Sequence, residues 1–169
     1  MADAILFGKL PSHGDFVSRG LGEAQSRAFD GWLSASLDAA AGLPGFDELY
    51  ALAPAWRFTA TFDGIPHCGI VALSVDSVGR RFPVVAGARG LSEALIEACE
   101  AALYTAFSEG LNADALYAAL ASAPDAAPAD TDADRWFLED GAGAVVEALS
   151  GAYPPNLISR MIEAARLTQ

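Results

Sequence analysis

Apolar and polar positions along the chain follow two periods, one typical of strands and one typical of helices. Residues 56–62 alternate large apolar with polar side chains, and residues 68–75 and 81–86 are apolar runs rich in β-branched residues. Such patterns are typical of half-buried and buried strands. The connections are short, with Asp-Gly turn chemistry at 63–64 and a glycine turn at 77–79. We therefore predict three antiparallel strands in a meander.

Two long segments repeat apolar residues with the period of a helix. Within 23–41, large apolar residues recur every four positions from 29 to 37, which places them on one helical face. Segment 91–109 has the same periodicity. Ser92 is suited to cap its start and Gly110 to end it, because serine accepts a backbone hydrogen bond and glycine tolerates positive φ. Both segments are predicted helices.

The rest of the chain is predicted to form loops and further elements of the same domain, so we expect a single domain over residues 1–169. Residues 8–20 predict an ordered loop, and the Ala-, Pro- and Asp-rich stretch 122–134 predicts a flexible acidic loop. The C-terminal part, 135–169, is expected to hold a strand and helices. The further predicted elements are strands at 3–7 and 136–138, the latter at a sheet edge, and helices at 113–121, 144–149 and 156–167. The fold class is α/β, a three-layer sandwich whose central sheet is largely antiparallel and flanked by helices.

Composition narrows the class of protein. The chain has 169 residues, 53% of them hydrophobic, which is enough for one packed core. Its 22 acidic and 10 basic residues give a net charge of −12. Nucleic acids and anionic lipids bind clustered Lys and Arg, so we expect neither as a partner. The chain has no apolar stretch long enough for membrane insertion, and its two cysteines fit a cytoplasmic location.

The loop at 8–17 holds the densest group of reactive side chains, with a serine, a histidine and an aspartate within positions 12–15. This composition suggests a hydrolase. However, a catalytic triad is assembled from separate elements, and the pattern Gly-x-Ser-x-Gly is absent. A rigid loop explains the residues better: Pro11 fixes one dihedral angle, Gly14 permits an unusual one, and Asp15 caps backbone donors. We expect no catalytic residues.

Metal and cofactor sites are not expected either. The two histidines, His13 and His67, are far apart in the sequence, and Cys68 and Cys99 form no closely spaced ligand pair. The glycines do not match a phosphate-binding loop.

A second cluster, 74–83, places two adjacent arginines after a glycine turn. Neighbouring side chains of a strand point to opposite faces, so one arginine is expected to pair inward and the other to be exposed. We expect Arg80 to be the buried one, close to Asp15, with Asp76 as the rival partner. Arg81 is then the candidate for recognising a carboxylate or phosphorylated group of a partner.

Four motifs occur in an order that resembles the TagF (ImpM) family associated with bacterial type VI secretion. They are GKLPSHGDFV at 8–17, WL at 32–33, APAWRF at 53–58 and SVDSVGRRFP at 74–83. The resemblance covers about the first 110 residues, and the four motifs together are specific where one alone is weak.

The sequence departs from the usual family pattern at three positions before the Phe-Pro pair. Leu73 replaces a proline, Ser77 replaces an arginine, and Arg81 stands where an aromatic residue is common. The resemblance therefore does not carry a partner contact over to Ser77. The residues that match the pattern are Asp76, Gly79, Arg80, Phe82 and Pro83.

The resemblance implies a longin-like fold and a non-catalytic function. Members of the family act as post-translational repressors of the secretion machine through binding to its forkhead-associated scaffold, and they oppose threonine-phosphorylation signalling. A structural accessory of the same machine is the alternative function. An unrecognised hydrolase that uses Ser12, His13 or Cys68 is a further one.

The two loops are the expected place for partner binding, because rigidly held loops carry much of protein recognition. The residues assigned to binding are Lys9, Ser12, His13 and Arg81. Those assigned to the structural framework are Gly8, Pro11, Gly14, Asp15, Phe16, Trp56, Asp76, Gly79, Arg80, Phe82 and Pro83. The competing interpretation is that both loops only brace the fold.

Overall fold

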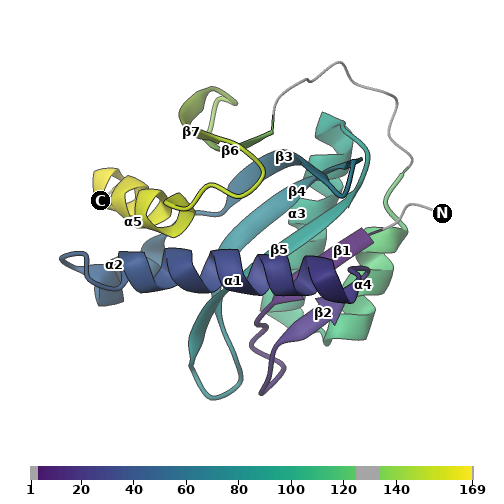
Figure 1. Cartoon of the computed structure of the whole chain (residues 1–169), viewed down its shortest axis with the longest axis horizontal. Helices are drawn as coiled ribbons and strands as arrows, with labels where there is room; N and C mark the ends of the chain where they lie inside the picture. Colours follow the sequence, from purple (N-terminus) through teal and green to yellow (C-terminus); the bar gives the residue numbers. More distant parts are fainter. Residues whose placement is uncertain (1–3, 125–133, 169) are drawn as a thin grey trace.

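A computed structural model describes residues 4–124 and 134–168 (Figure 1). The strands of this part of the chain are β1 (Ala4–Gly8), β2 (Val17–Arg19), β3 (Trp56–Phe62), β4 (Ile65–Val75), β5 (Arg81–Arg89), β6 (Arg135–Glu139) and β7 (Val145–Ser150). The helices are α1 (Glu23–Ala40), α2 (Phe46–Leu52), α3 (Glu93–Glu109), α4 (Ala113–Ala121) and α5 (Leu157–Leu167). None of the helices in this part of the chain has the length and apolar character needed to cross a membrane.

The strands form one antiparallel sheet in the order β2-β1-β5-β4-β3-β6-β7. The predicted meander is confirmed as β3, β4 and β5, and β1 pairs with β5 along its whole length. Because β4 is longer than β3, the last residues of β4 pair only with β5. They form with β5 a hairpin that projects beyond the end of β3. This hairpin carries the second sequence motif.

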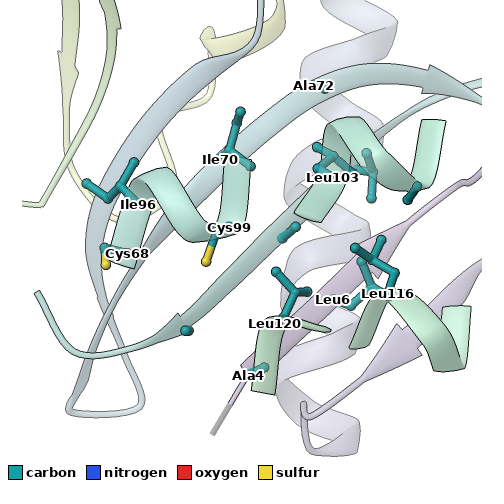
Figure 2. Packing of buried hydrophobic residues seen from close by; sticks show 14 of the residues in the cluster. Ala4, Leu6, Cys68, Ile70, Ala72, Ile96, Cys99, Leu103, Leu116 and Leu120 are labelled. Carbon is teal, nitrogen blue, oxygen red and sulfur yellow. The ribbon is translucent and has the colours of Figure 1, made fainter. Parts of the chain in front are cut away.

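Helices cover both faces of the sheet (Figure 1). On one face, α3 and α4 bury Leu103 and Leu116 against Leu6 and Ile70, as Figure 2 shows. On the other face, α1 and α5 pack over a cluster rich in aromatic residues, and α2 joins α1 and α5 in a smaller cluster. The predicted three-layer α/β sandwich is confirmed. Strands that carry apolar side chains on both faces need a layer of helices on each face to bury them.

The predicted helix ends agree with the structure at α3. The Ser92 hydroxyl accepts a hydrogen bond from the Leu95 amide at 3.0 Å, and Gly110 ends the helix with φ of 67°. The predicted helices 23–41 and 113–121 correspond to α1 and α4. Regular apolar periodicity therefore located these elements correctly.

The predicted helix at 144–149 is wrong, because these residues form most of β7. A tight turn precedes the strand: the Asp140 carboxylate accepts the amides of Ala142 and Ala144, and the chain then pairs back on β6. Since β7 is the outermost strand, the strand predicted at 136–138 is not at the sheet edge.

Two short elements were not predicted. Strand β2 pairs with β1 inside the segment expected to be a loop, and helix α2 follows the glycine and proline residues that end α1. Most of the predicted acidic loop lies outside the described residues.

Gly8 determines how the first loop leaves β1. Its φ is +132°, and a Cβ at this position would lie 2.0 Å from the carbonyl oxygen of Pro83. Only glycine combines this backbone conformation with so close an approach. The loop after β1 is thereby held directly against the β4–β5 hairpin.

Candidate functional site

The two motif loops form one surface, which we call the two-loop surface (residues 9–17 and 76–82). The amide of Ser77 donates to the carbonyl of His13 at 2.8 Å, and the Arg80 guanidinium donates to the carbonyl of Gly14 at 2.6 Å. These bonds join loops separated by about sixty residues of sequence, so the surface is fixed by backbone contacts as well as by side chains.

Asp76 lies buried at the junction of the loops and is 2% exposed. Its carboxylate accepts the backbone amides of Val78 and Arg80 at 3.0 and 2.9 Å, and the guanidinium of Arg80 at 2.7 Å. The ammonium of Lys9 lies 3.2 Å away. Burial acts to raise the pKa of Asp76, but the hydrogen bonds from Arg80, Val78 and Lys9 outweigh it and hold the pKa well below its usual range.

These contacts correct three expectations. Arg80 pairs with Asp76 and not with Asp15, whose carboxylate binds the neighbouring amide of Phe16 at 2.9 Å. The Arg80 side chain is also 63% exposed, so Arg80 is not the buried arginine of the pair. Conversely, Lys9 was expected to be exposed and is only 8% exposed, because it supplies the second cation that the buried Asp76 carboxylate requires.

Ser12 and His13 face the connection between α3 and α4. The Ser12 hydroxyl donates to the carbonyl of Leu111 at 2.8 Å. The Nε2 atom of His13 accepts the amide of Ala113 at 2.9 Å, at the start of α4. The first loop is therefore bound to the helical layer as well as to the hairpin. Since Nε2 accepts a backbone hydrogen bond, it is not placed to take a proton from Ser12.

Arg81 points away from the Asp76 cluster and onto α2. Its guanidinium binds the carboxylate of Asp47 and lies 5.4 and 5.3 Å from the ring centres of Phe46 and Tyr50. The side chain is 38% exposed, and that of Asp47 is 75% exposed. Arg81 thus presents a cation at the surface while its stem rests on aromatic rings.

A cleft of about 420 Å³ opens beside Arg81. Its lining is mostly apolar and includes Leu73, Phe107 and Pro11, with Tyr50 on the α2 side. The Tyr50 hydroxyl donates to the carbonyl of Ser74 at 2.6 Å, and burial raises its pKa well above the usual value. At neutral pH Tyr50 is therefore a neutral wall of the cleft.

Two apolar side chains project from the two-loop surface. The ring of Phe16 is 45% exposed and packs edge-on against Phe82 with centroids 4.8 Å apart, while the Lys9 ammonium lies 4.9 Å from its ring centre. Val78, at the tip of the hairpin, is 71% exposed. Val78 was not among the predicted site residues, although a valine inside a glycine turn is a signal that could have identified it.

Asp47 and Tyr50 were also missed. Sequence reasoning gave no signal for them, because it did not predict helix α2. The remaining framework residue, Trp56, is fully buried in the aromatic cluster under α1. The amide of Gly79 donates to the carbonyl of Asp76 at 3.0 Å, and its φ of 87° closes the hairpin turn.

Other reactive groups lie away from the surface. Cys68 and Cys99 are fully buried between β4 and α3 (Figure 2). Burial raises the pKa of both thiols, that of Cys99 to about 12. Within residues 4–124 and 134–168, no group of three or more His, Cys, Asp or Glu side chains is arranged to hold a metal ion.

The layered fold and the two bonded loops define an α/β sandwich domain that displays a braced loop surface. The sequence model of the TagF N-terminal domain, described as type VI secretion system-associated, matches residues 6–126. The chain therefore belongs to this family and is associated with type VI secretion.

A solved structure supports the fold independently. The chain is similar to PA0076 from Pseudomonas aeruginosa PAO1, with 22% sequence identity and a TM-score of 0.72. The match covers 94% of this chain and 93% of that chain. No curated protein matches the chain.

Proposed function

We propose that this protein is a non-catalytic, cytoplasmic regulator that represses assembly of a type VI secretion system by binding another protein. The partner proposed is the forkhead-associated scaffold of the machine. Membership of the TagF family supports the association with secretion. The regulatory role and the partner rest on the resemblance of the four sequence motifs.

The observation that carries the proposal is the bracing of the two-loop surface. Buried Asp76 bonds to both loops, and Ser12 and His13 bond to the α3–α4 connection. A surface that is already ordered loses little conformational entropy on binding. Its exposed groups, Arg81 with Phe16 and Val78, combine a cation with aromatic and aliphatic area, a mixture that is typical of protein interfaces.

The positions of the reactive groups support a non-catalytic role. Ser12 and His13 are occupied by separate backbone hydrogen bonds and do not form a nucleophile–base pair. Cys68 is buried with a raised thiol pKa, so it is poorly suited to act as a nucleophile. Within the proposal, Ser12 and His13 position the first loop, and Arg81 contacts the partner.

Deleting and overproducing the gene tests the proposed sign of regulation. A repressor predicts that deletion raises secretion of the system's tube protein and that overproduction lowers it. If deletion instead abolishes secretion, the protein is a structural accessory of the machine. A pull-down with the purified scaffold, using the intact chain and Arg81→Ala, tests the partner.

A further inference from the structure

The two edges of the sheet differ in how well they are protected. Strand β2 has three residues, and its Arg19 pairs with Asp114 of α4 at 3.1 Å. Strand β7 has six residues, VVEALS, without Lys, Arg or Pro. Within the described residues no strand pairs with its outer side. Natural sheets protect their edges with short strands, lysine, proline or bulges, because unpaired amides and carbonyls accept a further strand.

The protection of β7 is limited to one end. The register with β6 shifts between Leu138 and Glu139, whose partners are Glu147 and Val145, so Val146 is the extra residue of a bulge in β7. From Glu147 to Ser150 the pairing is regular. The only charged side chain of β7, Glu147, is bound to Arg160 of α5. The strand therefore offers a regular edge about 14 Å long whose single charge is paired, given about 3.4 Å per residue over four residues.

The exposed side chains of β7 add apolar area beside this edge. Val145 is 43% exposed and Val146 is 52% exposed. Ala148 is also exposed and is small enough not to obstruct an incoming backbone. A partner strand would gain main-chain hydrogen bonds along the edge and apolar contacts at these residues.

The charge of the segment around β7 and the short length of its edge indicate what kind of molecule would bind there. Residues 134–150 contain four acidic residues and one basic residue. Glu139 and Glu147 are paired with Arg57 and Arg160, which leaves Asp134 and Asp140 without a cationic partner among the described ion pairs, and the whole chain carries −12. A second copy would bring the same negative charge and only another short edge, far less than the roughly 1,200 Å² that stable interfaces bury. We propose that β7 binds an extended basic segment of another protein as an eighth strand of the sheet. The proposal is independent of the two-loop surface, which lies on other strands.

A synthetic peptide of alternating valine and lysine, blocked at both ends, tests the proposal. Binding is followed through the amide signals and hydrogen exchange of residues 145–150 in the intact chain. We expect the peptide to shift these signals and to slow the exchange of those amides that point away from β6. A peptide with glutamate in place of lysine should bind at least about tenfold more weakly.

Two lysine variants make the test specific. Ala148→Lys places a charged side chain on the edge and should weaken binding at least about tenfold. Ala119→Lys makes the same change on the exposed side of α4 and should leave binding unchanged. Thermal unfolding of both variants verifies that they are folded.

Three results would overturn the proposal. The first is equal binding of the lysine and glutamate peptides, and the second is peptide-induced shifts that lie outside β7. The third is slow exchange, without peptide, of those β7 amides that point away from β6. If that protection grows with protein concentration, a second copy covers the edge, and if it does not, another part of the chain covers it.

Discussion

Asp76 occupies the point where the two loops meet, and its surroundings predict the effects of single substitutions there. Asp76→Asn removes the charge that Lys9 and Arg80 share and leaves Lys9 buried beside a neutral amide. Lys9→Met keeps the volume of the stem and leaves Asp76 bound to Arg80 and two backbone amides. We expect Asp76→Asn to lower the denaturant midpoint more than Lys9→Met. The opposite order would mean that the Lys9 contact dominates the cluster.

The lowered pKa of Asp76 predicts a pH dependence of stability. Asp76 binds a proton more readily in the unfolded chain, where the pKa is about 3.9, than in the folded chain. Its contribution is complete above that unfolded value and is lost as the pH falls towards the folded pKa. The difference in Tm between the intact chain and Asp76→Asn should therefore be constant from neutral pH to about pH 5 and shrink below about pH 4. A difference that grows on acidification would refute the assignment.

Substitutions of Arg81 and Asp47 distinguish a role of Arg81 in partner recognition from a role in stability. Arg81→Ala removes a partly exposed ion pair and contacts with two rings, which should cost about 0.5–1 kcal/mol. Asp47→Ala removes only the ion pair and frees the guanidinium. If Arg81 recognises the scaffold, Arg81→Ala should abolish binding in a pull-down, while Asp47→Ala should preserve or strengthen it. Equal loss of binding in both variants would instead indicate that the pair acts as a structural unit.

Sequence reasoning identified the charged residues of the site but not all of their partners. Asp76 was named only as a rival partner of Arg80, because sequence spacing does not show which carboxylate is buried. Lys9 was predicted to be exposed as a member of a loop suited to partner binding. The burial of Lys9 depends on Asp76, which lies almost seventy residues later in the chain. Such pairings arise only when β1 and β5 bring the two loops together.

At the scale of elements, apolar periodicity predicted α1, α3, α4 and the β3–β5 meander. It failed where local signals are weak. Residues 144–149 are apolar except for Glu147 and include alanines, so they suit a helix locally, but pairing with β6 makes most of them a strand. Helix α2 has seven residues and is held by contacts with α5. Both cases show tertiary contacts deciding the structure of a short segment.

Two glycines predict opposite responses to the same substitution. Gly8→Ala places a Cβ 2.0 Å from the Pro83 carbonyl oxygen at positive φ, so the β1–β5 pairing must shift. We expect a loss of more than about 3 kcal/mol in the free energy of unfolding. Gly31, inside α1, has no atom within 4 Å of an added Cβ. Gly31→Ala should stabilise the protein by about 0.5–1 kcal/mol. Denaturant titration measures both, and a tolerated Gly8→Ala would contradict the described packing.

At the scale of the whole molecule, one sheet serves two cores. Side chains of β1, β4 and β5 point alternately into the aromatic cluster under α1 and α5 and into the aliphatic cluster under α3 and α4, whereas the buried hydrophobic residues of β3 all lie in the aromatic cluster. Neither helical layer has a sheet of its own to bury against. The loss of one layer would therefore expose apolar strand residues and weaken the other.

This arrangement predicts one cooperative unfolding transition, and the chain carries a natural probe in each core. The buried tryptophans Trp56 and Trp136 lie in the aromatic cluster, whereas Cys68 and Cys99 lie in the aliphatic one. Both thiols are fully buried and should not react with a thiol reagent in the native protein. Tryptophan fluorescence and thiol reactivity, followed in the same denaturant series, should give the same midpoint. Thiols that react before the fluorescence changes would show that the α3–α4 layer opens separately, and the single-domain interpretation would fail.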